Sequence, residues 1–223
     1  MLIANLSSLR YKIVYLVKMR LERLFVPRKM YCRIELIIRD MENDLRHRDA
    51  IKMFSLTRRS KGARNPGGGV AIFFKRQKIS LKRYRIKTNG FEILAAKGKI
   101  NNNTRPVYVI VAYLPPSLSV RSSRHALETI SDAILRMKLE TNSPYIIVGG
   151  DFNGFDLEGA VEDYDDVSVL DSPPTRKAAC LDLVATSIPE CLISIGPPLE
   201  NEDGVGSDHE ILLVSTHVCM YVC

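Results

Sequence analysis

The 223-residue sequence predicts an α/β (α+β) fold in which two packed β-sheets are flanked by helices. Many short apolar or alternating runs are typical of strands, and only two stretches have the longer spacing of a helix. Glycine or proline pairs separate the strands, as in hairpin connections. Hydrophobic residues make up 46% and charged residues 26% of the chain, which is a globular composition and excludes a disordered or fibrous chain.

The first half of the chain predicts one helix among several strands. Ile13, Leu16 and Val17 recur at helical spacing, and Pro27 would end the helix that contains them. The expected elements are a strand at 2–4, a helix from about 8 to 24, a strand at 34–38, irregular chain at 39–66, and strands at 70–74, 79–87 and 91–96.

The second half alternates strands with one long helix. Leu127, Ile130, Ile134 and Met137 lie on one face of a helix predicted over 120–139. No G-x-G-x-x-G or P-loop motif appears in the sequence, which disfavours a nucleotide-binding α/β fold. The remaining expected elements are strands at 107–113, 145–148, 181–186, 191–195 and 211–217.

Charge is distributed unevenly along the chain. Residues 1–100 hold 25 of the 32 Lys and Arg residues and 7 of the 25 Asp and Glu residues, a balance of +18. Residues 101–223 balance at −11, which leaves a net charge of +7. Drift in surface charge would explain this split, but so would a basic surface for phosphates beside an acidic half that holds a metal ion.

The composition also excludes several classes of protein. The five cysteines form no C-x-x-C pair, so neither a zinc site nor a disulfide framework is expected, and a reducing compartment is the default. No uncharged stretch exceeds 15 residues, and the longest contains three prolines, so we expect no membrane span. Basic residues interrupt the N-terminal apolar runs, and no signal peptide is expected.

The segment GGDFN is the first of several polar clusters at strand ends. Asp151 and Asn153 follow the apolar strand at 145–148, and their spacing places both side chains on one face where the strand ends. An acid and an amide there could polarise a water molecule and hold an oxyanion. Taken alone, a strand-to-turn cap explains these residues better, because Asp and Asn are common in turns.

Two further clusters involve carboxylates. Ser207, Asp208 and His209 precede the strand at 211–217 and put a carboxylate beside a titratable imidazole, although alone they fit a polar loop. Asp182 interrupts an apolar strand. A carboxylate buried there would need a partner such as a histidine, whereas an edge strand would leave it in water.

Tyr113 and Thr175 complete the set of candidates. Tyr113 ends a strand just before a pair of prolines, where its hydroxyl could donate to a phosphate oxygen or simply close a half-buried strand end. Thr175 follows another proline pair shortly before the strand at 181–186, and alone it could be a turn residue.

The order of the segments GGGVAIF, AYLPP, GGDFN, LDL and SDH resembles the endonuclease/exonuclease/phosphatase superfamily. From about residue 67 to 215 the chain is most similar to the apurinic-endonuclease-like endonuclease domains of non-LTR (LINE-type) retrotransposons. The resemblance implies a four-layered α/β sandwich with two packed mixed β-sheets flanked by helices. It implies a single domain over 1–223, in which residues 18–66 diverge from the family.

The resemblance also implies catalytic roles. Asp151 would orient or deprotonate the attacking water, and Asn153 would hold the phosphate or the nucleophile. His209 would pair with Asp182 and contact the scissile phosphate. Tyr113 would contact the phosphate as well.

Mg²⁺ or Mn²⁺ is the cofactor that the resemblance implies, and hard oxygen ligands suit such an ion. Asp208 would help to position the metal. The segment IANLSSLRYKI is similar to the family's opening strand-Asn-helix unit, which implies Asn5 as its active-site asparagine. Ser207 and Thr175 would contact the substrate or support the site.

The family's metal-binding glutamate has no clear counterpart in this sequence. It normally ends the second strand in a motif like E-T-W-L, where this chain reads IELIIRDMENDL. Glu35, Asp40 and Glu42 are the candidates, and Asp40 fits the register best. The register also passes through Arg39, whose charge would repel the ion.

These features together predict a Mg²⁺-dependent hydrolase that nicks DNA. We expect DNA as the partner, no membrane, and a monomer or a part of a larger polyprotein with a reverse transcriptase. The expected location is intracellular, nuclear or cytoplasmic, and nuclear if the substrate is DNA. Two alternatives stay open: a catalytically degenerate, retroelement-derived nucleic-acid-binding relic, and a phosphatase of the same superfamily.

Overall fold

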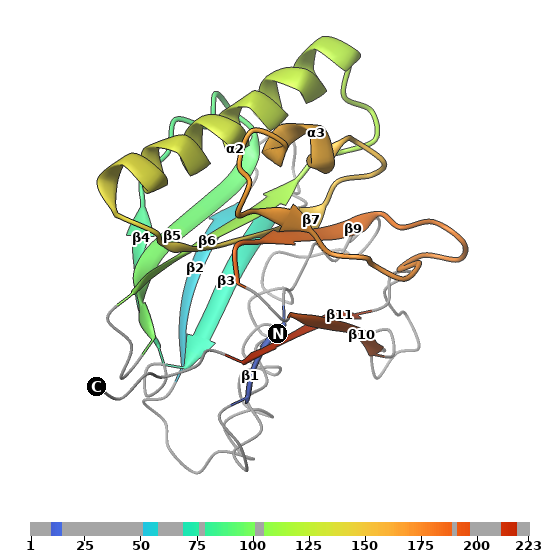
Figure 1. Ribbon diagram of the computed structural model, residues 1–223. Helices are drawn as coiled ribbons and strands as arrows, with labels where there is room; N and C mark the ends of the chain where they lie inside the picture. The colour runs from blue at the N-terminus through green and yellow to red at the C-terminus, as the bar shows by residue number, and fades with distance from the viewer. Residues whose placement is uncertain are drawn as a thin grey trace, which may run out of the picture.

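The protein is built around a six-stranded sheet with helices on one face and two smaller sheets on the other (Figure 1). The computed structural model describes residues 10–14, 51–57, 69–75, 79–100, 105–188, 191–196 and 211–217. Within these ranges, the α/β class and the packing of sheet on sheet are confirmed. The fourth layer of the expected sandwich stays a prediction.

The six-stranded sheet has the strand order β4-β5-β6-β7-β9-β8 and is mixed. β6 and β7 run parallel, and the other neighbours in this sheet run antiparallel. The parallel pair needs a long crossover, which the helix α2 provides. The strands are β4 (Ile79–Tyr84), β5 (Glu92–Ile100), β6 (Pro106–Tyr113), β7 (Tyr145–Asp151), β8 (Ser168–Val169) and β9 (Asp182–Thr186).

Helix α2 (Val120–Glu140) confirms the helix predicted over 120–139. The Ser119 side chain caps its first turn by accepting from the Ser122 backbone N–H at 3.2 Å. Ile130, Ile134 and Met137 are fully buried and pack on the sheet at helical spacing. A short helix, α3 (Leu157–Val161), lies on the same face. Neither of these two described helices combines the length and apolarity that crossing a membrane requires.

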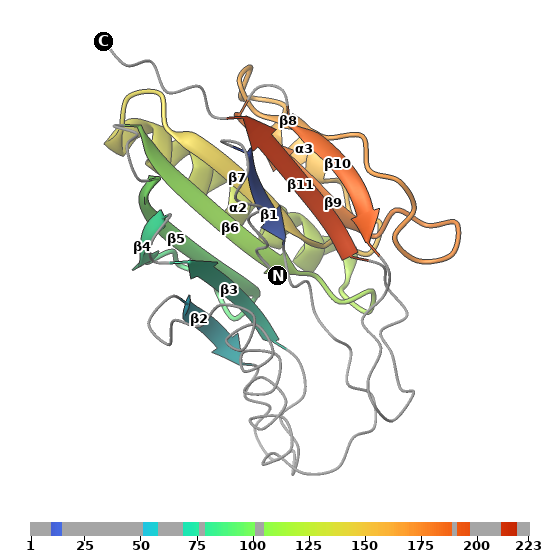
Figure 2. The ribbon, with the colours of Figure 1, turned by 90° about the horizontal axis from the view of Figure 1, so that it is seen from below.

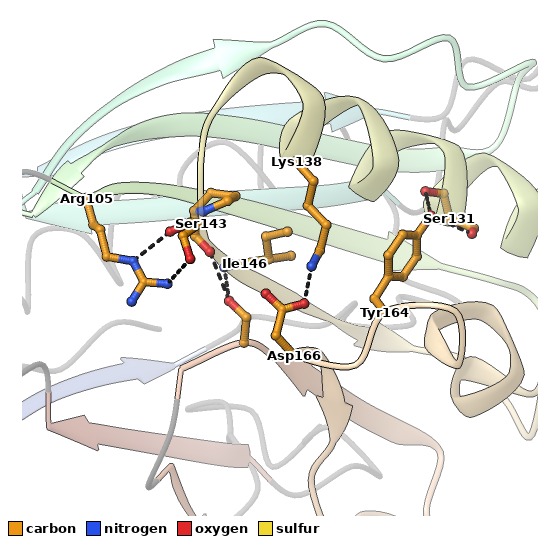
Figure 3. A network of polar contacts seen from close by, with 9 residues as sticks. Arg105, Ser131, Lys138, Ser143, Ile146, Tyr164 and Asp166 are labelled. Atoms are coloured by element: carbon orange, nitrogen blue, oxygen red, sulfur yellow. Dashed lines mark hydrogen bonds and ion pairs between the residues drawn. The ribbon is translucent and has the colours of Figure 1, made fainter.

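Polar contacts fasten the C-terminal half of α2 and the following loop to the sheet (Figure 3). Lys138 of the helix forms an ion pair with Asp166, in the connection that leads to β8. Arg105, which precedes β6, donates from Nε to the Ser143 carbonyl oxygen at 2.6 Å, and its guanidinium lies 4.0 Å from the centre of the Tyr145 ring. These contacts fix the crossover connection where α2 ends and β7 begins.

Two smaller antiparallel sheets cover the opposite face of the large sheet (Figure 2). Val70 and Ile72 of the first small sheet join the core formed by residues such as Val109 and Val111. That first sheet pairs β2 (Ile51–Thr57) with β3 (Gly69–Lys75), and the other has the order β1 (Arg10–Val14), β11 (Ile211–His217), β10 (Leu192–Gly196).

Two sequence-based expectations are wrong. Residues 10–14 form strand β1, within the region expected to be a helix, and residues 51–57 form strand β2, within the region expected to be irregular. Both segments gain a complete antiparallel partner, β11 and β3 respectively, and tertiary pairing of this kind overrides local propensity. The strands expected at 2–4 and 34–38 lie outside the described residues.

Candidate active site

Polar side chains form a row across one end of the six-stranded sheet. Tyr113 and Asp151 lie side by side at the ends of the parallel strands β6 and β7. Asp151 lies directly opposite Asp182, the first residue of β9. On the other side of Tyr113, Glu92 begins β5 and continues the row. The register therefore brings together four residues from four strands, which we call the polar row.

The polar row lies on the sheet face that packs against the smaller sheets. Side chains alternate between the faces of a strand, and each member of the row stands an even number of residues from a core residue of that face. The four side chains are between 3% and 8% exposed. The matching core residues are Leu94 on β5, Val111 on β6, Ile147 on β7 and Val184 on β9.

Asp151 and Asp182 put two buried carboxyl groups on directly paired positions. Like charges in such positions repel each other, and water that would screen them is largely excluded. A nearby cation or a protonated imidazole would offset this repulsion. The expected cation at this pair stays a prediction.

Gly150 brings β6 and β7 close together just before Asp151. A Cβ atom at Gly150 would lie 2.0 Å from the backbone oxygen of Ala112 on β6, a separation that real atoms do not reach. A side chain here would push the strands apart where Tyr113 and Asp151 meet. The glycine before the acid is thus a packing requirement of the polar row.

Asn153 is held in a tight turn after β7. Its backbone N–H donates to Asp151 Oδ1 at 3.2 Å, which is the turn cap that the sequence alone favours. Its side-chain Nδ2 donates to the Leu114 carbonyl oxygen at 3.0 Å. Its backbone has the left-handed φ of 48°, which Asn tolerates better than most residues. These contacts anchor Asn153 beside the row and orient the Asp151 carboxylate.

Thr175 lies beneath Asp182 and is fully buried. Its Oγ1 accepts from the Asp182 backbone N–H at 3.2 Å. Its own N–H donates to the Ala179 carbonyl oxygen at 3.1 Å, which closes the loop before β9. The geometry supports a role in holding Asp182, and a contact with substrate stays a prediction.

The remaining predicted site residues lie outside the described residues. They are Asn5, Asp40, Ser207, Asp208 and His209. In the part of the chain that the structure describes, no three His, Cys, Asp or Glu side chains are grouped closely enough to hold a metal ion. The proposed pairing of Asp182 with His209 and the full metal ligand set therefore stay predictions.

Glu92 is the member of the polar row that the sequence did not reveal. It stands at the start of a predicted strand, where a charged residue is commonplace. Its place next to Tyr113 depends on the antiparallel register of β5 and β6, which pairs Glu92 with Tyr113. The only signal in the sequence was an acid at the start of the strand that precedes the one ending in AYLPP.

The resolved pKa shifts belong to a separate cluster where α2 ends. Burial, followed by the hydrogen bond to Glu140, raises the pKa of Tyr84 to about 12. The same hydrogen bond, 2.7 Å from Tyr84 Oη to Glu140 Oε1, is the main cause that lowers the pKa of Glu140. Hydrogen bonding to Tyr108 leads the causes that raise the pKa of Lys97. This cluster ties the helix to β4 and β5.

Comparison with known proteins shows which family has this fold. Residues 19–209 match the Endonuclease/Exonuclease/phosphatase family, so the chain belongs to that family of nucleases and phosphatases. The match begins after Asn5 and ends at His209. No curated protein matches the sequence.

Solved structures of several family proteins share the fold. The human Nocturnin catalytic domain has a TM-score of 0.63 at 15% identity, covering 93% of this chain and 94% of that one. A mannosyl-6-phosphatase of Bacteroides thetaiotaomicron has a TM-score of 0.54 at 13% identity, covering 79% of each chain. The endonuclease domain of TRAS1, a telomere-specific non-LTR retrotransposon, has a TM-score of 0.50 at 17% identity, covering 74% of this chain and 78% of that one.

Proposed function

We propose that this chain is a Mg²⁺- or Mn²⁺-dependent DNA endonuclease of retrotransposon origin. The observation that carries the proposal is the polar row, in which Tyr113, Asp151 and Asp182 meet in register on one buried face of the sheet. A phenol and two carboxyl groups at one sheet end supply a phosphate contact, a base for water and charge for a cation.

The residues of the row divide the work of phosphodiester hydrolysis. Asp151 takes a proton from water, whose oxygen then attacks phosphorus in line with the leaving oxygen. The bond from phosphorus to the 3′ oxygen breaks, and that oxygen takes up a proton to become a 3′-hydroxyl. Tyr113 donates to a phosphate oxygen, and Asn153 keeps the Asp151 carboxylate and the attacking water in place.

The oxygen-rich donor set suits a hard divalent cation. Asp151 and Asp182 lie where they repel each other, and Asp208, Asn5 and Asp40 would complete the ligands. When bound, the cation would stabilise charge that develops on the phosphate. His209 would pair with Asp182, which Thr175 holds through its backbone N–H.

Retrotransposon origin is supported by the order of the sequence motifs and by the shared fold of the TRAS1 domain. In that setting the chain would act on chromosomal DNA in the nucleus, as a monomer or as part of a polyprotein with a reverse transcriptase. Its basic first half, with a balance of +18, would favour binding to the phosphate backbone.

A plasmid-nicking assay tests the proposal. The purified chain is incubated with supercoiled plasmid and Mg²⁺, beside Asp151→Asn, Asp182→Asn and the control Asp163→Asn. Asp163 is exposed and lies in the turn after α3, away from the polar row, so its variant should nick at the parent rate. Asp151→Asn should lose at least 100-fold in rate, as expected when a general base is removed, and Asp182→Asn should also lose rate because it removes the carboxylate that would pair with His209.

Other outcomes would select the alternatives. Release of phosphate from small phosphate esters without nicking would make the chain a phosphatase, and the shared fold of the mannosyl-6-phosphatase makes this arm necessary. Salt-sensitive DNA binding with no hydrolysis under Mg²⁺ or Mn²⁺ would make it a binding relic.

A further inference from the structure

The exposed face of the β4 segment has a regular pattern of positive charge. Arg83, Arg85 and Lys87 are exposed, and the residues between them, Tyr84 and Ile86, are half-buried. This alternation is that of an extended chain with one face packed and one face in solvent. We call the three exposed cations the cationic track.

The packed residues show which way the cationic track faces. Tyr84 and Ile86 pack into the core beneath α2. Leu81, two residues before Arg83, belongs to the core on the other face of the sheet, where the polar row lies. The cationic track therefore points to the same face of the sheet as the polar row.

The track also leads to the end of the sheet where the polar row lies. β4 ends at Tyr84, which lies opposite Ala95, and residues 85–91 form the connection that leads back to Glu92 at the start of β5. The turn between them closes with a hydrogen bond of 2.9 Å from the Phe91 N–H to the Thr88 carbonyl oxygen. Lys87 thus lies in the short connection that joins β4 to Glu92, the member of the polar row on β5.

The three cations are available for an external partner. None of them takes part in an ion pair among the described residues, in contrast to Lys97 and Lys138, which pair with Glu140 and Asp166. Two residues of extended chain span about 6.6 to 6.8 Å, so the track presents positive charge at regular steps over roughly 13 Å. A regular row of negative charges, such as a nucleic-acid backbone, is the complementary partner.

We propose that Arg83, Arg85 and Lys87 grip the phosphate backbone of a DNA substrate to one side of the scissile bond. β4, which carries the start of the track, is separated from β7, which carries Asp151, by three strand spacings of about 4.8 Å each, or about 14 Å. A DNA strand advances 3.4 Å per nucleotide, so the contacted phosphates lie roughly four nucleotides from the cleaved one. The inference deepens the proposed function and rests on it for the identity of the polyanion.

The test measures DNA binding in EDTA, where hydrolysis cannot occur. The double variant Arg85→Gln/Lys87→Gln is compared with the matched control Lys82→Gln/Lys99→Gln. Lys82 and Lys99 are exposed on the same two strands and their substitution removes the same charge, but they point to the α2 face of the sheet. Thermal unfolding monitors that all variants remain folded.

Fluorescence anisotropy with a labelled duplex gives affinity at 50 to 200 mM NaCl. Each phosphate contact contributes about 0.9 to the slope of log affinity against log salt. The affinity of the parent therefore falls about 12-fold more between 50 and 200 mM NaCl than that of a variant that has lost two contacts. We expect this change for the track variant and a smaller one for the control. Equal changes in both variants, or no change in either, would overturn the inference.

Nicking under Mg²⁺ separates this inference from the proposed function. If the track binds DNA in EDTA but the parent protein does not nick under Mg²⁺, the proposed endonuclease activity is refuted and the track stands as a DNA contact. If the track variant nicks plasmid with an unaltered KM, the inference about the track is refuted and the proposed endonuclease activity stands. If both hold, the track variant should raise KM for plasmid and leave kcat close to the parent value.

Discussion

Replacing Thr175 by valine should separate the support of Asp182 from general stability. Valine keeps the volume of the buried side chain but removes the oxygen that accepts from the Asp182 N–H at 3.2 Å. A buried N–H left without its acceptor costs about 1–3 kcal/mol. In a chain of this size, about 2 kcal/mol lowers Tm by roughly 4–8 °C.

Thr186→Val is a matched control for this change. Thr186 lies at the other end of β9, is 3% exposed, and also accepts from a backbone N–H, that of Ile188 at 3.0 Å. Thr186 Oγ1 also donates to the Ile146 carbonyl oxygen at 2.9 Å, so Thr186→Val should lose at least as much stability as Thr175→Val in thermal unfolding followed by circular dichroism. Only Thr175→Val should also lose nicking activity, because only that threonine holds a member of the polar row.

Thr175→Ser completes the series, because serine keeps the accepting oxygen. It should retain activity and lose only the stability that one buried methyl group contributes, about 1 kcal/mol. An unchanged Tm for Thr175→Val would refute the hydrogen-bond argument. Equal loss of activity in Thr175→Val and Thr186→Val would refute the link to the polar row.

Three further predictions concern the sheet and the helix. Gly150→Ala should lower Tm by at least the 4–8 °C expected for about 2 kcal/mol of overpacking, and it should reduce nicking. Gly90→Ala, which has open space around its Cβ, should cost about 1 kcal/mol because of its positive φ and should keep activity. Ile130→Ala, at the fully buried face of α2, should cost about 2–5 kcal/mol in urea unfolding. Because the folded-state pKa of Glu140 is lowered, its contribution is present at neutral pH and lost as pH falls through that pKa. Glu140→Gln should therefore lower Tm slightly at pH 7, since the pair with Lys97 is about 40% exposed and weak, and the difference from the parent should shrink as the pH falls below the usual range of a carboxyl pKa.

The spacing of apolar residues predicted most of the six-stranded sheet and its covering helix. The strand and helix periodicities of β6, α2 and β7 are strong because each element buries one whole face or both. The errors at residues 10–14 and 51–57 arose where pairing with another segment fixes the strand, about 200 residues away for β1 and 12 to 24 residues away for β2. Local periodicity cannot detect such a partner, and cross-strand pairing decided the structure there.

The sequence by itself determined the chemistry that is available. Asp151, Asn153, Asp182, Tyr113 and Thr175 could be selected because polar residues interrupt or end apolar strands in an order that resembles one family. The sequence also determined the unequal charge of the two halves, which drew attention to phosphate binding.

Only the tertiary structure decided which of these residues meet. Strand register places Asp151 beside Tyr113 and opposite Asp182, and it adds Glu92, which no local pattern singled out. Register also directs the cationic track toward the same sheet face. The physical reason is that strand pairing joins residues of the polar row that are 21 to 38 positions apart in sequence, and a shift of one residue would turn every side chain to the other face.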